Sequence, residues 1–141
     1  MNVWSGAAAV CMNGRGEMLM VLQGKPDEEK RWSVPSGGME PGETFEACCE
    51  REVWEETGYR VKVVRFLHEK SGAGSEGRFI FRYFEVKCIG GEAAIQDPDR
   101  LIHDIRWQSA ERIASLDLCF PEDRDFLLTY ISDRSADPQT N

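Results

Sequence analysis

One stretch decides how this chain folds, and it runs from Gly37 to Tyr59 with the sequence GGMEPGETFEACCEREVWEETGY. Its spacing of apolar residues predicts a helix over Thr44 to Thr57. The hydroxyl group of Thr44 is suited to cap the first turn, and Gly58 is placed for a left-handed cap after the last. This helix is the reference from which the elements on either side are assigned.

Carboxylates gather on one stripe of the predicted helix. At 100° per residue the stripe begins apolar and ends acidic, whereas an ordinary amphipathic helix would keep it apolar. Like charges three and four residues apart destabilise a helix by about 0.2–0.5 kcal/mol per pair, so a compensating cation is expected. Mg²⁺ prefers oxygen ligands and is held by one or two carboxylates, waters and substrate phosphates. The stripe comprises Phe45, Cys48, Cys49, Glu52, Glu55 and Glu56.

Strands are predicted on both sides of this helix. A hairpin is expected over residues 6–22, because the turn-forming residues 13–16 separate two apolar runs. The glycine-rich segment 71–77 is predicted to be a flexible loop beside the site. The predicted strands are Gly6 to Met12, Met18 to Leu22, Trp32 to Val34, Val61 to His68, Phe79 to Cys88 and Ile102 to Trp107, with a second helix from about Pro121 to Ile131.

The bulk properties describe one domain of an ordinary globular protein. The chain has 141 residues, and we assign residues 1–133 to the domain and 134–141 to a flexible C-terminal tail. A net charge of −8 argues against a nonspecific nucleic-acid binder, and a divalent cation would bridge the repulsion from an anionic substrate. The five cysteines show no zinc-ligand spacing. With no signal peptide and no membrane-spanning run, we expect a cytoplasmic protein that does not contact the membrane.

The stretch that contains this helix resembles the signature of the Nudix hydrolase family, which includes the MutT-like proteins. Gly37 to Tyr59 matches the Nudix box, G-x₅-E-x₇-R-E-U-x-E-E-x-G-U, in which U is aliphatic. Every fixed position is present, and only the last U differs because it is Tyr59. The resemblance implies an α/β fold of the Nudix type, a mixed β-sheet sandwiched between α-helices in an α/β/α arrangement. It also implies a pyrophosphohydrolase that uses Mg²⁺, with Mn²⁺ as the alternative.

The resemblance also implies roles for individual residues. Ser36 would supply a main-chain carbonyl to the metal, although the family usually has Pro-Gly-Gly where this chain has Pro35-Ser36-Gly37. The metal ligands would be Ser36, Glu52, Glu55 and Glu56. The catalytic residues would be Glu55, Glu52 and Arg51, and the orienting residues would be Gly37, Glu43 and Gly58.

The residue that removes the proton from the attacking water is left open by the sequence. Glu55 is the preferred general base because it lies beside the metal, and Glu76, Asp97 and Asp99 are the alternatives from later loops. Substrate contacts are unknown, with Arg31, Trp32 and Arg78 as weak candidates. The other tryptophans, including Trp4, are assigned to packing.

The substrate is predicted by elimination. Family relatives often place a phosphate-binding arginine where this chain has Gln23, and the markers of several subfamilies are missing. We therefore expect a nucleoside triphosphate, or a modified form of it, to be cleaved to the monophosphate and pyrophosphate. Nucleotide sugars, dinucleotides and capped RNA are the alternatives, and so is a non-catalytic nucleotide sensor. We expect a small-molecule partner and no DNA-binding module. Members of the family often form dimers, so the resemblance makes a homodimer a state to be tested.

Overall fold

The computed structural model describes residues 3–75, 77–96 and 100–136. Its elements follow the order β1 (Val3–Cys11), β2 (Met18–Gln23), β3 (Arg31–Ser33), β4 (Ser36–Gly38), α1 (Phe45–Thr57), β5 (Tyr59–Gly74), β6 (Gly77–Gly91), β7 (Ile102–Gln108), α2 (Ala110–Ile113), the 3-10 helix η1 (Pro121–Asp123) and α3 (Arg124–Ala136). Among these residues, no helix combines the length and apolar character needed to cross a membrane.

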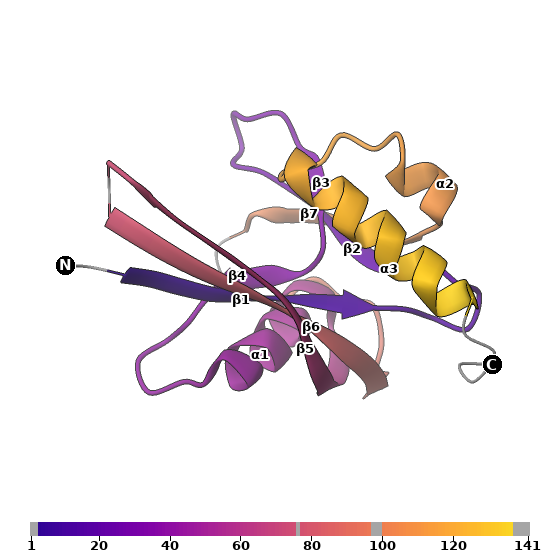
Figure 1. Ribbon diagram of the computed structural model, residues 1–141, viewed down its shortest axis with the longest axis horizontal. Helices are drawn as coiled ribbons and strands as arrows, with labels where there is room; N and C mark the ends of the chain where they lie inside the picture. The colour runs from indigo at the N-terminus through magenta and orange to yellow at the C-terminus, as the bar shows by residue number, and fades with distance from the viewer. Residues whose placement is uncertain (1–2, 76, 97–99, 137–141) are drawn as a thin grey trace.

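The strands form two sheets. One is mixed and has the order β4-β1-β6-β5, with β1 and β6 parallel and the other neighbours antiparallel. The other is antiparallel and has the order β3-β2-β7. Helices cover both faces of the mixed sheet (Figure 1), which is the α/β/α arrangement that the sequence predicted.

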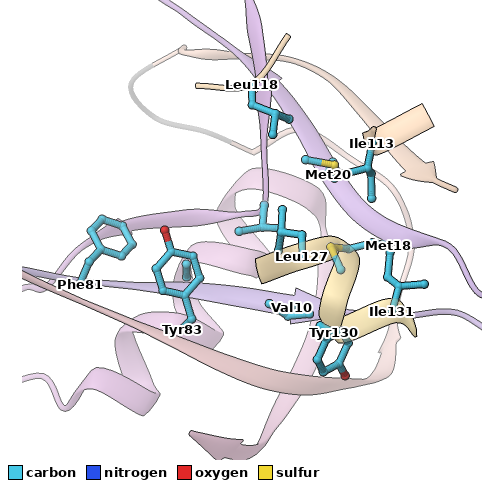
Figure 2. Close-up of a cluster of buried hydrophobic side chains, with 12 residues drawn as sticks. Val10, Met18, Met20, Phe81, Tyr83, Ile113, Leu118, Leu127, Tyr130 and Ile131 are labelled. Atoms are coloured by element: carbon cyan, nitrogen blue, oxygen red, sulfur yellow. The ribbon is translucent and has the colours of Figure 1, made fainter. Parts of the chain in front are cut away.

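The central strand β1 faces two cores because alternate residues of a strand point to opposite sides. Ala7 and Ala9 pack with Cys48, Cys49 and other residues of the α1 side. On the opposite face, Ala8 and Val10 belong to a second cluster that includes β2 and α3. Figure 2 shows this cluster, with the labelled side chains Val10, Met18, Met20, Leu127, Tyr130 and Ile131 meeting between the sheets and α3.

The predicted hairpin over residues 6–22 is wrong. The turn forms, since the Asn13 amide donates to the Glu17 carbonyl at 2.9 Å and Gly16 has a φ of 76°. However, β1 and β2 enter different sheets and share only an isolated bridge between Met12 and Met18. Turn chemistry specifies the change of direction, but pairing with β6 and β7 decides where each strand lies.

The predicted flexible loop at residues 71–77 is also wrong for the residues described. Strands β5 and β6 pair until Gly74 meets Gly77, so the glycine-rich segment forms the end of a long hairpin that projects from the body (Figure 1). Ladder hydrogen bonds compensate for the low strand propensity of glycine here. At the other end of the chain, α3 continues to Ala136 and therefore includes the first three residues of the predicted tail, while residues 137–141 lie outside the described chain.

Candidate active site

Helix α1 and strand β4 build the site, and local signals set both ends of the helix. The Thr44 hydroxyl accepts a hydrogen bond from the Ala47 amide at 3.0 Å. Gly58 ends the helix in the left-handed conformation, with a φ of 78°, and its amide donates to the Trp54 carbonyl. A Cβ atom at Gly58 would collide with the Glu92 carbonyl, so the position requires glycine.

Arg51 is the centre of the charged cluster. Its Nε and Nη2 atoms donate to the two carboxylate oxygens of Glu43, at 2.6 and 2.9 Å, in a bidentate pair. Its Nη1 atom reaches Glu52 at 2.9 Å and Glu55 at 3.2 Å. Nη2 also donates to the Gly38 carbonyl at 2.9 Å, which fixes β4 against the helix. One guanidinium therefore orients three glutamates and strand β4.

Strand β4 meets the remaining glutamates at close range. The Ser36 amide donates to the Glu56 carboxylate at 3.1 Å, and Glu56 is buried. At the next position, a Cβ atom on Gly37 would overlap the Glu52 carboxyl group. Gly37 is therefore required because the carboxylate occupies the space that a side chain would fill. The structure thus brings Ser36, Gly37, Glu52 and Glu56 together, and their roles as metal ligands and orienting residues stay predictions.

The electrostatics of the cluster follow from burial and charge. Burial raises the pKa of Glu52 to about 7, with Arg51 opposing this and Glu55 adding to it. The hydrogen bond from Arg51 lowers the pKa of Glu43 below its ordinary value, so the charged form of Glu43 is favoured. Burial therefore favours the protonated form of Glu52, and the Arg51 guanidinium favours the charged form.

The donor set has the chemistry of a divalent metal site. Glu52, Glu55 and Glu56 supply hard carboxylate oxygens from one side of α1, and Mg²⁺ and Mn²⁺ prefer such ligands. Within the described residues, no three His, Cys, Asp or Glu side chains are arranged as a metal-binding group. Arg51 Nη1 bridges Glu52 and Glu55 instead. The residues fit the ion by type, and by charge because Glu43, Glu52 and Glu55 share one guanidinium.

The weak candidates for substrate contacts lie in other parts of the fold. Arg31 forms ion pairs with Asp117 at 3.4 Å and Glu29 at 3.8 Å, and Trp32 packs against the core on the α3 side. Arg78 lines a cavity at the β5–β6 hairpin. Among the described residues, no hydrogen bond or ion pair joins these three side chains to Glu43, Glu52 or Glu55. The alternative general bases Glu76, Asp97 and Asp99 lie outside the described chain.

Trp4 is the residue near the site that sequence reasoning missed. Three atoms of its indole ring lie 3.2–3.3 Å from the position that a Cβ atom would take on Gly38. The sequence assigns it to packing in the core or at a semi-exposed position, and the structure leaves it 49% exposed. Its separation from the box in sequence gave no signal of this contact, which arises because β4 pairs with β1.

Comparison with known proteins places these features in a family. A model of the NUDIX domain matches residues 4–130. The chain is 38% identical over 80 residues to the 8-oxo-dGDP phosphatase NUDT18 of Mus musculus, covering 57% of this chain and 25% of that protein. It is 41% identical over 104 residues to putative nudix hydrolase 1 of Caenorhabditis elegans, covering 70% and 27%. It thus spans about a quarter of the length of these curated relatives.

Solved structures show the same fold. A NUDIX hydrolase from Nitrosomonas europaea superposes with a TM-score of 0.77 at 21% identity, covering 96% of this chain and 90% of that one. A MutT protein from Methanosarcina mazei has a TM-score of 0.73 at 20% identity, with 96% of both chains covered.

Proposed function

The chain belongs to the NUDIX domain family, and from this premise we propose that it hydrolyses a phosphoric anhydride bond in a nucleoside diphosphate linked to a further group. The observation that carries the proposal is the cluster of Glu52, Glu55 and Glu56, three carboxylates held beside the backbone of β4 by Arg51 and the Ser36 amide. Such a cluster is suited to phosphoryl transfer, in which positioning and charge stabilisation supply most of the catalysis.

The cluster would work with Mg²⁺, or with Mn²⁺ in its place. Glu52, Glu55 and Glu56, with the main-chain carbonyl of Ser36, are the residues that would hold the ion. When bound, a divalent metal ion withdraws charge from phosphoryl oxygens and lowers the pKa of water. Arg51 keeps its bidentate pair with Glu43 in this proposal and so continues to orient the helix face toward β4.

Glu55 is the proposed general base. Its side chain is 24% exposed, against 13% for Glu52, so water reaches it more readily. The hydrogen bond from Arg51 Nη1 limits its orientation. A glutamate that takes the proton from the attacking water in this position needs no movement of another loop. Replacement of Glu55 by Gln, compared with the same change at Glu76 and with Asn at Asp97 and Asp99, would identify the base.

A nucleotide is the proposed substrate, with a nucleoside triphosphate or a modified form as the first candidate. Cleavage would release the monophosphate and pyrophosphate. Relatives named as an 8-oxo-dGDP phosphatase, an NAD-capped RNA hydrolase and an RNA pyrophosphohydrolase support nucleotide derivatives as a class. Their names differ in the group linked to the diphosphate, so a substrate panel is needed.

The deciding experiment measures phosphate or pyrophosphate release from nucleoside triphosphates, ADP-ribose, nucleotide sugars and dinucleoside polyphosphates with Mg²⁺ or Mn²⁺. We expect turnover that EDTA stops and that Glu56→Gln abolishes. Glu46→Gln is the matched control, because Glu46 is an exposed glutamate of the same helix. Turnover that survives Glu56→Gln would contradict the assigned cluster. Nucleotide binding without turnover of any compound would indicate a nucleotide sensor instead.

Two narrower proposals concern location and assembly. We propose a cytoplasmic protein, because the five cysteines are all free thiols and a reducing compartment would keep them so. We also propose a homodimer as the state to be tested, by light scattering after size-exclusion chromatography. A monomeric mass at micromolar concentration would contradict it.

A further inference from the structure

Two lysines lie directly opposite each other on neighbouring strands of the mixed sheet. The register pairs Lys62 of β5 with Lys87 of β6, and both residues are exposed. Like charges that face each other across two strands destabilise a sheet. Neither lysine side chain forms a hydrogen bond or an ion pair with any residue that the structure describes. In a chain with a net charge of −8, a pair of cations without a carboxylate partner is unexpected.

A third cation lies on the same face of the sheet. Alternate residues of a strand share a face, so Lys87 points to the same side as Glu85, which accepts a hydrogen bond from the Tyr130 hydroxyl of α3 at 2.8 Å. Arg65 is paired with Glu85 in the register, and its Nε and Nη2 atoms both donate to Glu85 Oε1 at 3.2 Å. Arg65 and the two lysines therefore all face the side of the sheet on which α3 lies.

Glu85 balances only part of this positive charge. One of its carboxylate oxygens, Oε1, accepts the hydrogen bonds from both Arg65 and Tyr130. The Nη1 atom of Arg65 donates to no residue that the structure describes, and the Arg65 side chain is 63% exposed. One carboxylate therefore serves one guanidinium, and the charges of the two lysines remain unbalanced.

The three cations border a cavity between α3 and the sheet. Arg65 and Glu85 line this space of about 460 Å³ together with residues of α3, and its volume is within the range of small-molecule sites. Asp133 and Arg134 of α3 add one charge of each sign to its wall. The charges that line the cavity therefore cancel, and the surplus positive charge beside it comes from the lysine pair.

This region is separate from the candidate active site. The strand order β4-β1-β6-β5 puts β4, which meets the glutamates, at one edge of the sheet and β5 at the other. Neighbouring strands are spaced by about 4.8 Å, so these edges lie roughly 14 Å apart. Helix α1, which carries the glutamates, also packs on the face opposite to α3. A phosphate held by the lysines is therefore bound apart from the glutamates.

We propose that Lys62, Lys87 and Arg65 form a second anion site, which binds the phosphate groups of a small phosphorylated molecule. At pH 7 a phosphate group carries a charge of about −1.5 to −2 and offers three strong acceptor oxygens. Such an anion relieves the repulsion between the two lysines and accepts a hydrogen bond from Arg65 Nη1. Free pyrophosphate and the phosphates of a nucleotide share this chemistry, and in a nucleotide the nucleoside would occupy the cavity. The site does not depend on the proposed hydrolysis.

Calorimetric titration with pyrophosphate at low ionic strength tests the site directly. Metal is removed on a chelating resin, because EDTA is itself a polyanion and because metal-free glutamates repel pyrophosphate from the candidate active site. We expect saturable binding that Lys62→Met and Lys87→Met each weaken at least about fivefold. Lys25→Met is the matched control, because Lys25 is an exposed lysine that follows β2 of the other sheet. No saturable binding, or binding that both variants leave unchanged, would overturn the proposal.

Thermal unfolding excludes the possibility that the variants act by perturbing the fold. A ligand that binds only the native state raises the melting temperature, so pyrophosphate is expected to stabilise the native chain and to leave the Lys62→Met/Lys87→Met double variant unchanged. Without pyrophosphate, removal of the opposed charges is expected to make the double variant at least as stable as the native chain. A double variant that pyrophosphate stabilises as much as the native chain would contradict the site.

ADP distinguishes the two sources of the phosphate groups. It is titrated in the same metal-free buffer, and only the binding that Lys87→Met weakens is assigned to this site. ADP that binds more tightly than pyrophosphate would identify a nucleotide as the ligand, because the nucleoside adds contacts in the cavity. ADP that binds equally or more weakly would identify the free anion. If Lys87→Met weakens neither ligand, the lysine pair is not an anion site.

Discussion

Replacing Arg51 by lysine keeps the positive charge at the centre of the cluster but removes the planar guanidinium group. Arg51 donates five hydrogen bonds to oxygen atoms, two to Glu43 and one each to Glu52, Glu55 and the Gly38 carbonyl. A lysine ammonium has three donors on one atom. It can therefore keep at most three of the five, and at least two oxygen atoms lose their donor.

The expected cost follows from those two lost contacts. A hydrogen bond that involves a charged group contributes about 1.5–3 kcal/mol. Arg51 is only 20% exposed, so solvent replaces the lost contacts poorly. We expect the free energy of unfolding to fall by about 3 kcal/mol, the low end for two such bonds. With a urea dependence of about 1–3 kcal/mol per molar, the unfolding midpoint would fall by about 1–3 M.

Urea unfolding followed by tryptophan fluorescence measures this change directly. Arg106→Lys is the control, since Arg106 is 65% exposed and pairs with one carboxylate. An exposed pair contributes about 0–1 kcal/mol, so its midpoint is expected to move little. A midpoint for Arg51→Lys within the error of the native one would refute the reasoning, because it would mean that a point charge suffices and that the fork geometry adds no stability.

Three further outcomes follow from the same structure. Gly37→Ala is expected to lower metal-dependent turnover at least about 100-fold, because its methyl group displaces the Glu52 carboxylate, and turnover near the native rate would disprove that contact. Arg51 holds the pKa of Glu43 below 4.5. The stability that Glu43 contributes is therefore present above pH 4.5 and is lost as pH falls through the lowered pKa. Between pH 3 and 6, the free energy of unfolding of Glu43→Gln should depend less steeply on pH than that of the native protein. Iodoacetamide is expected to modify the exposed Cys88 rapidly in the native protein and to spare Cys11, whose pKa burial raises to about 12, as peptide mass spectrometry would show.

Local signals explain what the sequence predicted well. The helix α1 was expected to begin at Thr44 and to end at Thr57, and the structure places Thr44 at the cap and ends the helix at the same residue. The cap hydroxyl, the left-handed glycine and the spacing of apolar residues all act within a few residues of the ends. The hydrogen bond from the Ser36 amide to Glu56 was not predicted, because Ser36 precedes the box and the sequence assigned only its carbonyl, as a metal ligand.

Non-local pairing explains what the sequence did not predict. Nothing near Met12 and Met18 shows that β1 pairs with β6 while β2 pairs with β7. The segment that ends at Gly74 reads as a loop until the register of the whole β5–β6 ladder is known. Trp4 likewise reads as a packing residue, because its contact with Gly38 exists only after β4 has joined β1.

The two consecutive glycines of the box serve opposite faces of one strand. The structure extends Gly37 and Gly38 as part of strand β4. Successive residues of a strand point to opposite faces, so the two missing side chains serve different sides. Gly37 leaves space for the Glu52 carboxylate on the α1 face, and Gly38 leaves space for the Trp4 indole on the other. An insertion of one residue in β4 would exchange these faces, and it would therefore displace the Glu52 carboxylate and the Trp4 indole together. If the insertion displaced one of these two side chains and left the other in place, the two contacts would not both depend on strand β4.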